Sequence, residues 1–182
     1  MAIEPEHLIA ETPTYSTPKA TGYTQSQIEE LAASIAGKLG FEPGGELKPV
    51  VERLGGNFKY LDTEAYFGEG GTARIVIDGP RNFVISLYKL GGLFDNRFAI
   101  AHELGHYFLH SEMGKRPITA GHAEGAVSRE EWEASVFAAA FLMPRSQVHS
   151  LSARYTDYDL SAYFSVSIEA VEGWKKLISP SN

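Results

Sequence analysis

The chain has 182 residues, of which 43% are hydrophobic, 12% aromatic and 21% charged; this balance is typical of one globular domain and excludes wholesale disorder, collagen and a coiled-coil rod. Its 16 Lys and Arg against 23 Asp and Glu give a net charge of −7, so we expect no direct nucleic-acid partner. Cysteine is absent, which excludes disulfides, thiolate metal ligands and cysteine nucleophiles.

The distribution of apolar residues predicts where the protein resides. No apolar run reaches the roughly 18 residues that a membrane span needs. The first residues lack the basic region and the sustained apolar stretch of a secretory signal. We therefore expect a cytoplasmic protein with no membrane partner.

The chain divides into three parts. Residues 1–23 contain three prolines among Thr, Ser and Tyr, and because proline lacks the N–H that helices and sheets require, we predict a flexible, extended arm. Residues 24–150 form the main predicted domain. Residues 151–182 are predicted to form a helical extension packed on that domain.

Hydrophobic periodicity and turn residues predict a mostly helical chain with a small sheet in its middle. The first helix begins at Thr24, which forms a capping-box pair with Gln27. The expected helices are 24–39, 47–54, 96–110, 128–143, 159–164 and 168–178, and the expected strands are 58–61, 73–77 and 83–87. The pattern predicts an α+β fold in which a three-stranded antiparallel or mixed sheet packs on the 96–110 helix.

The motif that carries chemistry is His102-Glu103-Leu104-Gly105-His106, an H-E-x-x-H sequence in the middle of a predicted helix. Residues four apart on a helix share a face, so both imidazoles can meet one Zn²⁺. Glu103 projects beside them and can take a proton from a zinc-bound water. The alternative is a helix whose two histidines make only local hydrogen bonds.

A catalytic zinc needs a third protein ligand, and carboxylates at the start of the 128–143 helix are the best candidates. Ser128 and Glu131 form an S-x-x-E capping box, which gives Glu131 a structural role. Glu133 lies one turn before Phe137 on the apolar face, where a bare carboxylate must be paired, protonated or on a metal. We therefore expect Glu133 as the ligand, with Glu130 as the reserve.

Other histidines are weaker candidates. His110 continues the four-residue spacing, but on a straight helix it lies about 12 Å from His102, too far for one ion to bridge. We expect His110 to be a helix-end residue that interacts with the helix dipole. His122 and His149 stay as alternative ligands.

The sequence resembles the ImmA/IrrE metallopeptidases, a family of zinc peptidases of bacteria, mobile elements and phages. The resemblance spans about residues 25–178. It is carried by RFAIAHELGHY at 97–107, EASVFA at 133–138 and LMP at 142–144. One departure is Ser135, where the family usually has Asn; the residue is expected to support the site or to pack between helices.

The resemblance implies a zincin-like fold and a function. His102, His106 and Glu133 would bind Zn²⁺, and Glu103 would be the general base. The substrate would be a helix-turn-helix transcriptional repressor, cut at one site so that silenced genes are expressed. Two alternatives stay open: a non-catalytic binding module with a structural metal, and a toxin–antitoxin component that acts on another protein.

Two further segments bear on how a protein substrate is bound. Strand 83–87 could align an extended peptide if it lies at the edge of the sheet; the alternative is an interior strand. The helix pair joined at 165–167 is similar to a helix-turn-helix, but its second helix carries two acidic and two basic residues. This charge balance favours packing or repressor docking over DNA binding.

Overall fold

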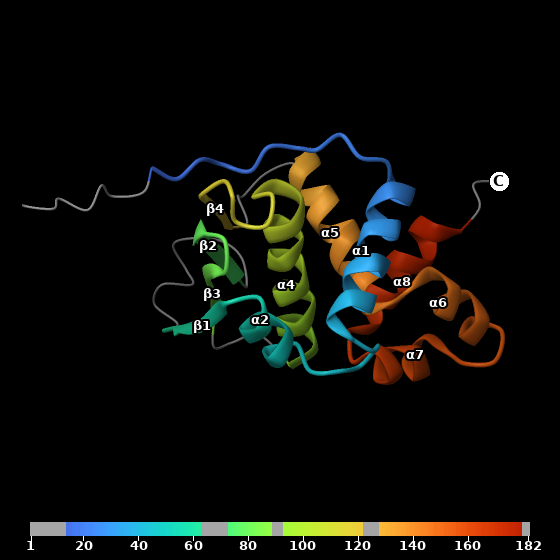
Figure 1. Ribbon diagram of the computed structural model, residues 1–182. Coiled ribbons are helices and arrows are strands. Elements are labelled where there is room, and N and C mark those ends of the chain that lie inside the picture. The colour runs from blue at the N-terminus through green and yellow to red at the C-terminus, as the bar shows by residue number, and fades with distance from the viewer. Residues whose placement is uncertain (1–13, 63–72, 89–92, 122–127, 180–182) are drawn as a thin grey trace, which may run out of the picture.

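The computed structural model describes residues 14–62, 73–88, 93–121 and 128–179. Their fold is mixed α+β, as the sequence predicts (Figure 1). The helices are α1 (Gln25–Leu39), α2 (Lys48–Arg53), α4 (Leu93–Gly105), α5 (Arg129–Leu142), α6 (Arg145–Ser152), α7 (Asp157–Phe164) and α8 (Ile168–Ile178). The strands are β1 (Gly56–Leu61), β2 (Ala73–Gly79), β3 (Asn82–Tyr88) and β4 (Ile118–Gly121), and a π-helical turn η1 (His106–His110) extends α4.

The sheet is mixed and has four strands in the order β1-β3-β2-β4. β1 pairs with β3 in parallel, whereas β2 is antiparallel to both β3 and β4. The fourth strand, β4, was not expected from the sequence. Strand β3 lies between β1 and β2, so the idea that segment 83–87 forms a peptide-binding edge is wrong.

The architecture is a series of layers: the sheet, then α4, then α5, then α1 (Figure 1). Alternate residues of β2 are buried, because successive side chains of a strand point to opposite faces. The ring of Phe83 in β3 packs against that of Tyr107 in η1 at a centroid distance of 4.6 Å, which joins the sheet to the helical extension of α4. Helix α5 is buried over most of its length, as expected for a helix apolar nearly all round.

Helices α6 to α8 follow the end of α5. The indole Nε1 of Trp174 donates a hydrogen bond of 2.9 Å to the carbonyl of Met143. Because Met143 is the C-cap of α5, this bond ties α8 to the end of α5. Ser165 ends α7 in the left-handed conformation, with φ of 55°, and Ser167 caps α8. Among the described residues, no helix has both the length and the apolar character needed to cross a membrane.

The described part of the N-terminal arm, residues 14–24, lies along the body of the protein (Figure 1). Ser16 forms a parallel bridge with Ile118 at the free edge of β4. Tyr15 donates a hydrogen bond to Asp78. The segment then passes the start of α5, where its backbone meets Glu133. Specific contacts thus hold this segment against β4 and the start of α5.

Candidate active site

The two histidines of the motif lie on one face of α4 and its π-helical extension. His102 and His106 are buried, with exposed fractions of 3% and 0%. Their Nε2 atoms are 3.2 Å apart, so the two lone pairs point to a common region. Burial lowers the pKa of His106 from 6.5 to about 4, which keeps its imidazole neutral and able to bind a metal at neutral pH.

A carboxylate from α5 completes this cluster, and it belongs to Glu131. Its Oε2 lies 3.1 Å from Nε2 of His102, and its Oε1 lies 3.2 Å from Nε2 of His106. One ligand atom from each of the three residues lies within 4.8 Å of the others. Burial opposes ionisation of Glu131, but hydrogen bonds with the two histidines hold its pKa well below the usual range. Two imidazoles and an ionised carboxylate fit Zn²⁺.

The structure does not bring Glu133 to the histidine pair. Its Oε2 accepts hydrogen bonds from N and Oγ1 of Thr21, at 2.8 and 2.9 Å, and lies 3.1 Å from Nε2 of His110. Its Oε1 accepts from N of Gly22 at 2.9 Å and from Nε of Arg129 at 3.1 Å. The structure therefore places Glu131, and not the expected Glu133, beside the histidine pair, while donors surround both carboxylate oxygens of Glu133.

Glu133 is buried, as the apolar face of its helix predicted. Burial alone would raise its pKa, but hydrogen bonds from Thr21, His110 and Arg129 lower the pKa below the usual value. The residue is thus a paired, ionised carboxylate, one of the solutions that a buried carboxylate requires. The predicted burial of Glu133 is confirmed, and hydrogen-bond donors of the protein compensate its charge.

The capping role assigned to Glu131 is also only part of its function. The side chain of Ser128 accepts a hydrogen bond from the backbone N–H of Glu131, which caps α5 as expected. The Glu131 carboxylate, however, reaches the imidazoles. Glu131 and Ser135 are four residues apart, so they share the face of α5 on which both contact His102.

Glu103 lies on α4 next to the histidines and is 1% exposed. Burial and the negative charge of Glu131 raise its pKa well above 4.5; a hydrogen bond with the backbone of Ile75 and the charge of Arg74 oppose this shift. Its Oε2 has no hydrogen-bond partner among the described residues. A buried carboxyl with an unsatisfied oxygen is suited to accept and return a proton.

Two neighbours contact the far sides of the imidazoles. Oγ of Ser135 lies 3.2 Å from Nδ1 of His102. Nδ1 of His110 lies 2.9 Å from Nδ1 of His106. His110 is 1% exposed and is not part of the group formed by His102, His106 and Glu131. It is the last residue of η1, as expected, and its ring contacts His106 and Glu133.

The other candidate ligands lie elsewhere. The metal-ligand grouping found among the described residues does not include Glu130. His149 is exposed on α6, and His122 lies outside the described residues.

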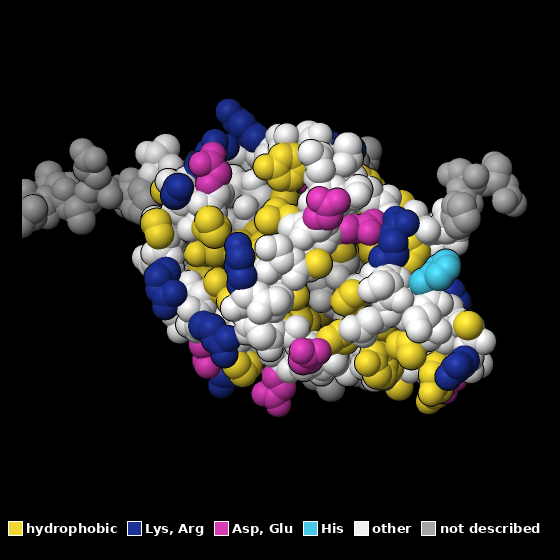
Figure 2. All heavy atoms as spheres, turned by 45° about the vertical axis from the view of Figure 1, so that its right-hand side comes forward, with side chains coloured by type: hydrophobic (Ala, Val, Ile, Leu, Met, Phe, Trp, Pro, Cys, Tyr) yellow, Lys and Arg dark blue, Asp and Glu magenta, His cyan; other side chains and the backbone are white. Residues whose placement is uncertain are grey.

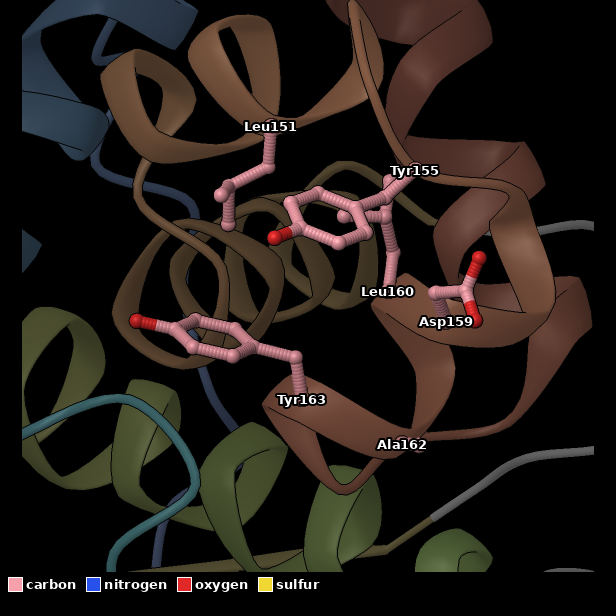
Figure 3. A pocket seen from close by; sticks show the side chains of 6 residues that line it. All are labelled: Leu151, Tyr155, Asp159, Leu160, Ala162 and Tyr163. Carbon is pink, nitrogen blue, oxygen red and sulfur yellow. The ribbon is translucent and has the colours of Figure 1, made fainter.

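A separate pocket of about 270 Å³ lies between α6 and α7, lined by the side chains in Figure 3. Tyrosines and aliphatic residues dominate that lining, on the side of the molecule where Figure 2 shows hydrophobic side chains at the surface.

Comparisons with known proteins show the family and the fold of this chain. Residues 67–173 match the IrrE N-terminal-like domain of the Peptidase M78 family. A solved structure of a Mycobacterium tuberculosis transcriptional regulator is similar in fold, with a TM-score of 0.56 and 19% sequence identity. The match covers 85% of this chain and 48% of that protein, so this chain spans about half of its length. No curated protein matches the sequence.

Proposed function

The chain belongs to the Peptidase M78 family of IrrE N-terminal-like domains, and on this premise we propose that it is a zinc-dependent endopeptidase. In this proposal His102, His106 and Glu131 bind the metal and Glu103 is the general base. The observation that carries it is the convergence of two imidazole nitrogens and a carboxylate within 4.8 Å, next to a buried carboxyl whose Oε2 has no hydrogen-bond partner in the described part of the chain.

In the proposed hydrolysis of a peptide bond, each residue of the site has a separate role. Zn²⁺ bound there would polarise the scissile carbonyl and make a water acidic at neutral pH. Glu103 takes the proton of the attacking water at Oε2 and delivers it to the nitrogen of the leaving amine. Glu131 and the two imidazoles would hold the metal, and of these three side chains only that of Glu131 reaches the surface, with an exposed fraction of 19%.

The proposed substrate is a helix-turn-helix transcriptional repressor in the cytoplasm. The family membership supports a peptidase that acts on a regulator, and the structural neighbour is itself a transcriptional regulator. The C-terminal helix does not favour DNA as the partner, because Glu169 and Glu172 balance Lys175 and Lys176. Lys175 is moreover paired with Asp157 at 2.5 Å.

The test has two stages, metal content and cleavage. Purified protein is loaded with zinc and assayed by elemental analysis, and it is then mixed with the repressor encoded nearest to its gene. We expect one equivalent of zinc and one new pair of fragments, absent with EDTA and with Glu103→Gln. Bound zinc without cleavage of any repressor tested would favour the non-catalytic module, and fragments that persist with Glu103→Gln would contradict the assigned base.

A further inference from the structure

We propose that His110 and Glu133 form a positioning pair that fixes the ring of His106 for metal binding, an inference that rests on the proposed metal site. Two contacts in series link the three residues. Nδ1 of His106 meets Nδ1 of His110 at 2.9 Å, and Nε2 of His110 meets Oε2 of Glu133 at 3.1 Å. The exposed fractions of these three side chains do not exceed 1%.

The proton positions along this series follow from chemistry. Two ring nitrogens at 2.9 Å need one proton between them, since two lone pairs would repel. His106 must keep the lone pair of Nε2 for the metal, so its proton lies on Nδ1 and is donated to His110. His110 accepts at Nδ1, and as a neutral ring it therefore carries its proton on Nε2. That proton is donated to Glu133.

Several further hydrogen bonds fix the carboxylate of Glu133, the last residue of the series. Glu133 accepts further hydrogen bonds from Thr21, Gly22 and Arg129, so its carboxylate cannot turn away from His110 without leaving donors unpaired. Two of these donors belong to the N-terminal segment, more than 100 residues away along the chain. The segment thus anchors, through Glu133 and His110, one ligand of the proposed metal site.

The backbone explains how His110 reaches this place. The N–H of Ser111 donates to the carbonyl of His106 at 3.0 Å, a five-residue spacing that widens the helix into a π-turn. The turn places the ring of His110 4.9 Å from that of His106, between His106 and α5. His102 has a simpler support, the hydroxyl of Ser135.

The experiment compares zinc affinities of full-length variants. His110→Phe keeps a ring of similar size but removes the acceptor, and we expect its affinity to fall about 10–100-fold. His110→Asn keeps an acceptor near the place of Nδ1 and should recover most of the loss. His149→Phe makes the same replacement at an exposed site on α6 and should bind zinc as the parent does.

A second measurement does not depend on any variant. Long-range ¹H–¹⁵N correlation spectra of the zinc-loaded parent should show the proton of His106 on Nδ1 and that of His110 on Nε2. The opposite tautomer of His110, or a folded His110→Phe protein that binds zinc with unchanged affinity, overturns the positioning pair and leaves the peptidase proposal intact. A parent protein that binds no zinc overturns the proposed function, and the pair with it.

Discussion

Gly105 of α4 lies directly against Ala134 of α5: a Cβ at Gly105 would stand 2.9 Å from the Cα of Ala134 and 3.0 Å from its carbonyl oxygen. The glycine within the H-E-x-x-H motif therefore lets the two helices approach closely. The approach has a chemical consequence, because Glu131 lies one turn before Ala134 and reaches His102 and His106 across the same contact.

Gly105→Ala tests this contact. Alanine in a helix interior is favoured over glycine by about 1 kcal/mol, but here its Cβ would press on backbone atoms and force the helices apart. We expect lower thermal stability and weaker zinc binding. Gly173→Ala in α8 is the matched control, because a Cβ there meets nothing within 4 Å. The control should be slightly stabilised, and a stabilised Gly105→Ala with normal zinc affinity would contradict the packing argument.

Alanine substitutions at Glu130, Glu131 and Glu133, near the start of α5, distinguish between the candidate zinc ligands. Loss of a residue that contacts a metal ligand lowers metal affinity about 10–100-fold. We expect Glu131→Ala to lower zinc affinity by more than this, because Glu131 is the proposed ligand itself. Glu133→Ala should lose less than Glu131→Ala, because Glu133 acts through His110. Glu130→Ala is the control and should bind zinc normally. Isothermal titration with zinc in a competing chelator gives the three constants, and a larger loss at Glu133 than at Glu131 would restore Glu133 as the ligand.

Most of the described helices were predicted from the sequence, but α6 was not. The capping box of Thr24 and Gln27 is confirmed, and so is the mixed α+β architecture. Strand β4 was missed because four residues give too short a pattern, and its pairing with β2 is set by tertiary contacts.

The structure groups Glu131, and not the predicted Glu133, with the two histidines, and the reason is physical. Periodicity along α5 correctly placed Glu133 on the buried side, but burial does not tell which partner compensates the charge. The partners of Glu133 come from Thr21 and Gly22, a contact that no local pattern of α5 encodes. The small residues Ala134 and Ser135, opposite Gly105, mark the face that meets α4 and point to Glu131.

Glu103→Gln is expected to abolish cleavage, retain zinc and stabilise the metal-free protein at neutral and higher pH. In the unfolded chain Glu103 ionises near pH 4.5, but in the folded protein its pKa is raised well above that value. The folded state therefore binds more protons in this range, and its stability falls as pH rises above 4.5. Glutamine removes this loss. Thermal melts in EDTA at pH 5 and pH 8 check it; the advantage of the variant should grow with pH. An equal melting temperature at pH 8 would contradict the burial argument.

In the metal-free protein, titration of His106 makes stability rise with pH, whereas titration of Glu103 makes it fall. Its pKa falls from 6.5 in the unfolded chain to about 4 in the folded state, so the unfolded state binds more protons between these values. Stability is therefore lost as pH falls from about 6.5 towards 4, by up to about 3 kcal/mol at about 1.4 kcal/mol per pKa unit. Urea unfolding in EDTA between pH 7 and 5 should show a steeper loss for the parent than for His106→Gln. His149→Gln, an exposed site, should keep the slope of the parent. If the stability of His106→Gln falls with pH as steeply as that of the parent, the loss of stability does not come from protonation of His106.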